Sequence, residues 1–350
     1  MCGVTALRMS LGRARRPRAR TLAVLAVLGV ALVGCAGPTA APTASPTPPP
    51  SALPQPGVAA LRGTPVDPAA GDHPALSVKI DNQQSARPQI GLDRADLVFE
   101  ELVEGGLTRY AALWHSDVPD DVGPVRSVRP MDPDILSSFG GIVAYSGGQP
   151  QFVEAMQNTP LVNVVFDTDE TGLFRRVAER ESPHDVVLSA AEVVQRNSEL
   201  APPGRQFDYA DSAATSGAAL TGDATTAILT AFSASSGRGW TWDAAAGAYL
   251  RSQDGDVDLD AGGVQLAATN VVVLRVDVDR STEVPRTLLS GSGEAWVSSN
   301  GATLAATWFK DAAVAPIRLA DAAGATVDLA PGNTWIELVP TDDGSVELVP

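Results

Sequence analysis

The chain has 350 residues, of which 44% are hydrophobic and 19% charged, and its formal net charge at pH 7 is −16. A surface this acidic repels phosphate backbones, so nucleic acid is not expected as a partner. The three histidines, His73, His115 and His184, are widely separated and the cysteines number two. We therefore expect no metal site and no cofactor. The length allows about two domains.

The first segment, residues 1–34, has the pattern of a secretory signal peptide. Five arginines between positions 13 and 20 precede an apolar run from Leu22 to Val33, which is too short to span a hydrocarbon core of about 30 Å. The sequence Leu32-Val33-Gly34-Cys35 resembles the lipobox of bacterial lipoproteins. This resemblance implies cleavage before Cys35 and lipidation of its sulfur, with two or three acyl chains anchoring the protein at the extracytoplasmic face of the cell membrane.

Residues 35–74 predict a disordered linker behind the lipidated cysteine. Positions 36 to 57 contain eight prolines, mostly among Ala, Thr, Ser and Gly, and no charged residue. A segment of this composition cannot bury a core, so we expect an extended tether between the lipid and the folded part.

An N-terminal domain with mixed α/β structure is predicted over residues 75–202. Its apolar residues alternate in several short runs, and a Gly-Gly pair between two such runs is typical of a β-hairpin. The expected elements are strands at 76–80, 97–104, 107–116 and 142–145, a helix from about Pro150, and helical spacing from 186 to 194.

Residues 203–224 are rich in Pro, Gly, Ser, Thr, Ala and Asp and predict a second linker. The last segment, residues 225–350, predicts a β-rich C-terminal domain in which short apolar runs alternate with turns. The fold class expected for the whole chain is therefore α+β. The clearest strands are expected at 264–268, 270–278, 294–297, 303–309 and 334–339.

The predicted hairpin places charged residues close together. If Gly105 and Gly106 form a two-residue turn, Glu100, Glu104 and Arg109 share one face, with Arg109 diagonal to both carboxylates. An ion pair at the hairpin tip is one interpretation, and a carboxylate pair of a glycosidase is another. Strand residues four apart are separated by about 13 Å, however, whereas catalytic carboxyl pairs lie about 5–9.5 Å apart.

Three further motifs could hold an anion. Arg126 and Arg129 stand three apart and could grip a carboxylate or phosphate, or pair with acids of the same chain. Ser146, Gly147 and Gly148 precede the predicted helix and could offer backbone N–H groups, or form an ordinary turn. His184 could transfer a proton or bind an anion, or be a satisfied hydrogen-bonding residue.

These motifs together resemble the YerB-like family of bacterial lipoproteins, which has paired N- and C-terminal domains of unknown function. The family usually has asparagine at the position of Asp185, and here the chain departs from its pattern. The resemblance extends from about Leu61 to the end and implies the architecture and the membrane address, but no reaction. The segments that carry it are 86–92, 95–100, 103–109, 123–129, 182–185, Trp242, Tyr249, Arg251, Asn270, Gly293, 307–308 and 331–335.

We expect a membrane-anchored protein that binds an anionic envelope component, such as peptidoglycan or another anionic wall polymer. Arg109, Arg126, Arg129 and His184 would hold the anion, with Glu100 and Glu104 orienting the arginines. One alternative is a wall hydrolase or lyase with either glutamate as general acid. Another is a regulatory partner of envelope enzymes. Binding is favoured over catalysis because no nucleophile, metal set or cofactor loop has a specific signature.

Overall fold

The structure is a computed structural model that describes residues 57–67 and 71–350. The predicted signal peptide at 1–34 and the predicted lipidation at Cys35 lie outside the described residues. Within them, no helix is both long enough and apolar enough to cross a membrane. The described residues belong to one compact unit.

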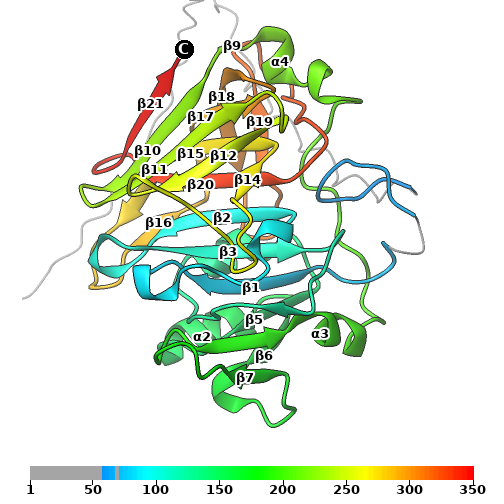
Figure 1. The fold of residues 1–350 in the computed structure, drawn as a ribbon, viewed down its shortest axis with the longest axis vertical. Helices are drawn as coiled ribbons and strands as arrows, with labels where there is room; N and C mark the ends of the chain where they lie inside the picture. Colours follow the sequence, from blue (N-terminus) through cyan, green and yellow to red (C-terminus); the bar gives the residue numbers. More distant parts are fainter. Residues whose placement is uncertain (1–56, 68–70) are drawn as a thin grey trace, which may run out of the picture. The chain divides into compact units, whose positions relative to one another are not determined.

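The largest sheet has twelve strands and runs through both halves of the chain (Figure 1). Two further strands pair beside its main path: β16 (Arg286–Leu288) pairs with β15 (Asn270–Asp279), and β9 (Asp223–Ala224) pairs with β18 (Ala302–Lys310). The main path follows the order β19 (Arg318–Ala320), β18 (Ala302–Lys310), β17 (Gly291–Ser299), β15 (Asn270–Asp279), β20 (Thr334–Pro340), β2 (Leu97–Leu102), β3 (Thr108–Trp114), β1 (Leu76–Asp81), β5 (Ile142–Tyr145) and β6 (Val162–Val165).

The two halves join where β2 pairs in parallel with β20, from Leu97 opposite Thr334 to Glu100 opposite Glu337. All residues of both strands are buried, as expected for parallel strands covered on both faces. The strands predicted at 76–80, 270–278 and 334–339 are confirmed. The mixed N-terminal part and the β-rich C-terminal part are also as predicted, but they share this one sheet.

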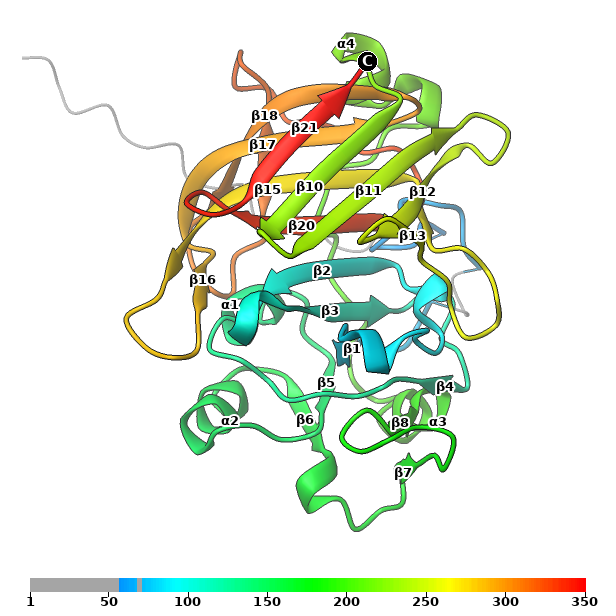
Figure 2. The same cartoon turned by 60° about the vertical axis from the view of Figure 1, so that its left-hand side comes forward.

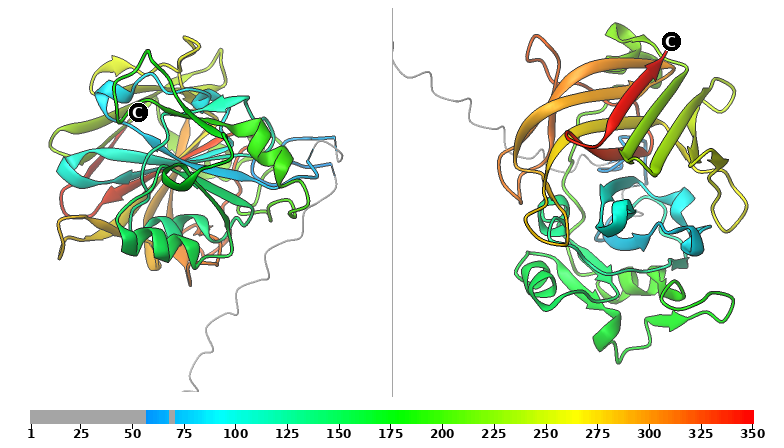
Figure 3. Two further views of the ribbon diagram at one scale, coloured as in Figure 1. Left: turned by 90° about the horizontal axis from the view of Figure 1, so that it is seen from below. Right: turned by 90° about the vertical axis from the view of Figure 1, so that its left-hand side faces the viewer.

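A second, six-stranded sheet comes from the C-terminal half and packs on one face of the large sheet (Figure 2). Its aromatic contacts reach across both halves: the rings of Trp240 and Tyr110 lie 5.2 and 5.3 Å from the ring of Trp335. Strand β21 lies beside β10 at the edge of this sheet (Figure 3). Its strands are β13 (Asp256–Val257), β12 (Ala248–Gln253), β11 (Ser236–Asp243), β10 (Ala227–Ser233) and β21 (Ser345–Val349), with β14 (Ala267–Ala268) beside β12.

The short helices α1 (Asp132–Leu136), α2 (Pro150–Gln157) and α3 (Ala190–Arg196) lie on the N-terminal part, whereas α4 (Gly217–Thr221) packs on β17 and β18 of the C-terminal part. Helix α2 begins at the predicted Pro150. The helical spacing predicted from 186 to 194 is wrong in its first half, where Val186–Ser189 form strand β8. The buried β-branched pair Val186 and Val187 suits a strand, and β8 lies between β4 (Asp121–Val122) and β7 (Phe174–Arg176).

The two segments predicted as linkers pack onto the fold where the structure describes them. Leu61 is buried, and Arg62 pairs with Asp96 at 2.5 Å. In the second segment, Phe207 is buried and the Tyr209 hydroxyl donates to the Leu61 carbonyl at 2.6 Å. Both segments therefore contribute to the core of the compact unit.

The predicted hairpin is present, but its register differs by one residue. Residues Glu104–Gly106 form a three-residue turn (η3), which the Val103 N–H closes by donating to the Leu107 carbonyl at 2.8 Å. Glu101 therefore lies opposite Arg109, and Glu100 lies opposite Tyr110. A one-residue shift moves side chains to the other face, so Glu100 and Arg109 do not share a face.

Candidate functional site

The predicted arginines and His184 meet at the carboxyl ends of β1 and β5, two neighbouring parallel strands. The segment that carries Arg126 crosses these ends: its N–H donates to the Lys79 carbonyl at 2.8 Å, and its carbonyl accepts from the Ser146 N–H at 3.0 Å. The carboxyl end of parallel strands is where ligands bind in open α/β sheets. The candidate site is therefore at this edge, and we call it the arginine site (Asp81, Glu104, Arg109, Arg126, Ser127, Arg129, Ser146 and His184).

Asp81 organises one side of the arginine site. Its buried carboxylate lies 2.9 Å from the Arg126 Nε and 2.7 Å from the His184 Nδ1. With Nδ1 bonded to the carboxylate, the Nε2 of His184 is left for another partner. Asp81 thus fixes both a guanidinium and an imidazole with one carboxylate.

Arg109 is the least neutralised cation of the arginine site. Its side chain donates to the Ser127 carbonyl at 3.0 Å and makes no ion pair within the described part of the chain. Burial, followed by the positive charges of Arg129 and Arg126, lowers the pKa of Arg109 to about 10, although the negative charges of Asp81 and Glu104 act in the opposite direction. A guanidinium that lies this close to two others, without a carboxylate of its own, favours an additional anion.

Arg129 and Glu104 form the outer side of the arginine site. The Arg129 Nε donates to the Glu104 carboxylate at 2.8 Å, and the Glu104 side chain is 36% exposed. Burial acts to raise the pKa of Glu104, but the hydrogen bond from Arg129 outweighs it, and the pKa lies below its ordinary value. Glu104 is therefore ionised at neutral pH and orients Arg129.

The segment predicted to offer backbone N–H groups also places the hydroxyl of Ser146 at the arginine site. The Ser146 N–H is already bonded to the Arg126 carbonyl, while its hydroxyl lies 3.3 Å from that of Ser127. The carboxylate of Asp167 lies against Gly147, where a Cβ would stand 1.9 Å from its Oδ2. A carboxylate of the chain itself thus lies beside Gly147, whereas Gly148 faces Val128 and Val153.

A buried charged cluster lies beneath the arginine site. The Lys79 ammonium pairs with Glu101 and, at 2.7 Å, with Asp132, and all three side chains are fully buried. Burial, together with the charge of Asp132, raises the pKa of Glu101 to about 7. Asp132 also accepts from the Arg129 N–H at 2.6 Å, so this cluster supports the backbone of the site.

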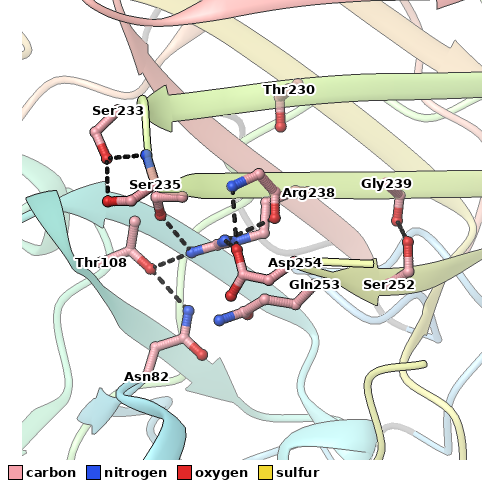
Figure 4. A network of polar contacts seen from close by, with 12 residues as sticks. Asn82, Thr108, Thr230, Ser233, Ser235, Arg238, Gly239, Ser252, Gln253 and Asp254 are labelled. Atoms are coloured by element: carbon pink, nitrogen blue, oxygen red, sulfur yellow. Dashed lines mark hydrogen bonds and ion pairs between the residues drawn. The ribbon is translucent and has the colours of Figure 1, made fainter. Parts of the chain in front are cut away.

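Glu100 belongs to a different network, between the two halves of the chain. Its carboxylate accepts from Arg238 at 2.6 Å and from Arg251 at 2.8 Å. Burial acts to raise the pKa of Glu100, but the charges of both arginines lower it below its ordinary value. Figure 4 shows the part of this network around Arg238, which donates to the Thr108 hydroxyl, with Asn82 donating to the same hydroxyl.

The structure thus brings together most of the predicted site residues but separates one of them. Arg109, Arg126, Arg129, His184, Glu104 and Ser146 meet, whereas Glu100 does not. Sequence analysis missed Asp81, which stands at the end of a strand that was predicted only from its apolar residues. It also missed Ser127, although this residue lies between the two arginines. Among residues 57–67 and 71–350, no group of three or more His, Cys, Asp or Glu side chains could hold a metal ion.

The two halves of the chain match the two domain models of one protein family. Residues 61–202 match the model described as "Protein of unknown function (DUF3048) N-terminal domain", and residues 228–336 match that of the C-terminal domain. "Putative lipoprotein YerB" of Bacillus subtilis (strain 168) is 25% identical over an alignment of 316 positions, which covers 82% of this chain and 87% of that protein.

A solved structure has the same fold. The crystal structure of the YerB protein from Bacillus subtilis matches with a TM-score of 0.71 and 22% identity, over 83% of this chain and 99% of that chain. The predicted resemblance is confirmed by these matches. The chain carries both the N-terminal and the C-terminal domain of the DUF3048 family and belongs to that family.

Proposed function

We propose that this protein is a lipoprotein, anchored at the extracytoplasmic face of the membrane through Cys35, that binds an anionic component of the cell envelope at the arginine site. The anchor is supported by the lipobox-like sequence at Cys35 and by a relative named as a lipoprotein. Binding is supported above all by Arg109, which lies beside two other guanidinium groups and has no carboxylate within ion-pair distance in the described chain.

The charge balance of the arginine site agrees with an anionic ligand. Its three arginines face two carboxylates, those of Asp81 and Glu104. Arg109 is the arginine that has no ion pair within the described part of the chain, and the formal net charge of the whole chain is −16. In a partly buried setting an unpaired cation is costly, and an anion that supplies the missing charge gains several hydrogen bonds to guanidinium groups.

The two glutamates considered as general acids do not support the hydrolase alternative. A general acid needs a pKa near the working pH, but the pKa values of Glu100 and Glu104 both lie below their ordinary value. Glu100 is also fully buried between two arginines. Glu104 lies in the arginine site but is ionised there, and Glu100 lies outside the site.

A pelleting assay with purified cell-wall sacculi tests the proposal. The chain from residue 49, which holds the compact unit, is incubated with intact sacculi and with sacculi stripped of their anionic polymers. We expect binding to intact sacculi, and Arg126→Ala should weaken it about tenfold, or about 1.4 kcal/mol, with little change in melting temperature. Arg126 is suited to this because its side chain is 21% exposed.

Arg175→Ala is the matched control. Arg175 also pairs with an aspartate, Asp121, but lies on strand β7 and is 47% exposed. It should bind as the unaltered protein does. If Arg126→Ala folds and binds equally well, or if intact sacculi retain no protein, the proposal is wrong. Soluble wall fragments released during the incubation would instead favour the hydrolase alternative.

A further inference from the structure

An open hollow of about 560 Å³ adjoins the arginine site and is lined by Gln83, Gln84, Ser85 and Leu107. It lies between the two chain segments that carry the acids of the site. On one side, the Gln83 N–H donates to the Asp81 carboxylate at 3.2 Å. On the other, the Leu107 N–H donates to the carbonyl of Glu104. A ligand held by the arginines can therefore extend into this hollow.

The lining of the hollow has no charged side chain, in contrast to the arginine site. Two carboxamides and a hydroxyl can each donate and accept hydrogen bonds, and Leu107 is an exposed apolar residue. Within residues 57–67 and 71–350, the side chains of Gln83 and Gln84 have no hydrogen-bond partner. Amides with free donors and acceptors beside an apolar surface match the hydroxyls and the C–H face of a polyol or sugar.

The donors of the arginine site point to the chemistry of the anionic group. Strand β3 and the segment that crosses β1 and β5 both contribute guanidinium groups. The hydroxyls of Ser127 and Ser146, which lie 3.3 Å apart, add two further donors. Donors that converge from several segments suit a tetrahedral oxyanion better than a planar carboxylate. A phosphodiester carries one negative charge, and Arg109 is the one arginine of the site without an ion pair in the described part of the chain.

We infer that the ligand is a phosphodiester of a polyol or sugar, whose phosphate binds among Arg109, Arg126, Ser127 and Ser146 while its polyol occupies the hollow of Gln83, Gln84, Ser85 and Leu107. This inference rests on the proposed function and adds the ligand class to it. The hollow is open to solvent, so a polyol or sugar unit would lie in it with one face exposed.

Titration calorimetry with three matched probes tests the inference on the chain from residue 49. Glycerophosphoglycerol carries the phosphodiester and the polyol, dimethyl phosphate carries only the phosphodiester, and gluconate carries a polyol with a carboxylate. We expect glycerophosphoglycerol to bind at least tenfold more tightly than either of the others. The double variant Gln83→Ala/Gln84→Ala should lose this preference but keep its affinity for dimethyl phosphate.

Two control variants distinguish the contribution of the hollow to binding from that of the arginine site. Gln195→Ala, on the exposed surface of α3, should keep the preference, whereas Arg126→Ala should weaken both phosphodiesters. Equal affinity of the unaltered protein for glycerophosphoglycerol and dimethyl phosphate would overturn the inference, and so would tighter binding of gluconate. An unchanged preference in the double glutamine variant would overturn it as well.

The source of the phosphodiester is distinguished by a vesicle arm. Phosphatidylglycerol vesicles present the same glycerophosphate group, with phosphatidylcholine vesicles as the control. Selective, Arg126-dependent binding to the first would assign the ligand to a lipid headgroup, whereas binding of the soluble probe alone would assign it to a polymer or free diester. If sacculi binding depends on Arg126 but no polyol preference is found, only this inference fails and the proposed function stands.

Discussion

The carboxylate of Glu100 accepts a hydrogen bond from the Arg251 guanidinium at 2.8 Å, across 151 residues of sequence, and both side chains are fully buried. Arg251 also pairs with Asp258 at 2.8 Å and lies 4.6 Å from the ring centre of Trp335. Strand β2 of the N-terminal half and strand β12 of the C-terminal half are therefore joined by a desolvated charge network, in addition to the backbone pairing of β2 with β20.

The first prediction concerns Arg251. Its replacement by alanine leaves the buried carboxylates of Glu100 and Asp258 without this partner, and removing one member of a buried pair costs about 3–5 kcal/mol. Arg251→Ala should therefore lower the free energy of unfolding, measured in urea, by several kcal/mol. Arg318→Ala, which removes a pair exposed on both sides, should cost less than about 1 kcal/mol. Equal effects of the two variants would contradict the importance of the network.

The second prediction is that the halves do not fold separately. Without the C-terminal half, β2 loses the strand paired with Leu97–Glu100, and the buried Glu100 loses Arg238 and Arg251. Residues 57–202 alone should give no cooperative thermal unfolding followed by circular dichroism, whereas the chain from residue 49 should. A sharp transition for the fragment would show that the shared sheet is dispensable for folding.

The third prediction follows from the raised pKa of Glu101, about 7 in the folded protein against an ordinary value of 4.5. Between these values the folded state holds a proton that the unfolded chain has lost, so this group makes stability fall as pH rises from about 4.5 to 7. One fully linked proton gives a slope of about 1.4 kcal/mol per pH unit. Glu101→Gln removes the group and should flatten the decline.

Urea unfolding at several pH values between 4.5 and 8 measures this difference. Other carboxylates contribute to the pH dependence of the protein, so the quantity to compare is the difference between variant and unaltered protein. Glu199→Gln, at an exposed position, is the control and should leave the curve unchanged. A Glu101→Gln curve parallel to that of the unaltered protein would mean that Glu101 is ionised throughout this range.

Local pattern was enough to predict nine of the 21 strands in the described residues, because alternating apolar residues are a property of short segments. The strand at Leu76–Asp81 and the helix beginning at Pro150 are examples. The hairpin register was mistaken because it depends on whether the turn has two residues or three. Here Gly105 and Gly106 both have positive φ, of 71° and 73°, and extend the turn to include Glu104.

The residues of the candidate site could be predicted where several of them lie close together in the sequence. They could not be predicted where their interaction partners are distant in the sequence. Arg126 and Arg129 stand out because they are close together in an acidic chain. The role of Glu100 depends on Arg238 and Arg251, which lie 138 and 151 residues away. The neighbouring sequence does not distinguish Glu100 from Glu101. The register of the hairpin places Glu100 at the interface of the two halves and Glu101 at the base of the arginine site.

The last prediction concerns Gly147, whose φ of 149° is rarely adopted by residues with a side chain. A Cβ there would also stand 1.9 Å from the Asp167 carboxylate, so the carboxylate and the backbone would both have to move. Backbone strain of this kind costs about 1–3 kcal/mol. Gly147→Ala should lower stability by this amount and, by displacing the neighbouring Ser146, weaken phosphodiester binding in the calorimetric assay.

Gly237→Ala is the matched control, because a Cβ at Gly237 meets no atom within 4 Å and its φ is not positive. This variant should unfold within about 0.5 kcal/mol of the unaltered protein. If Gly147→Ala is equally stable but binds less well, the segment at Ser146 serves the ligand and not the fold. If it is less stable but binds normally, the hydroxyl of Ser146 has no part in holding the phosphate.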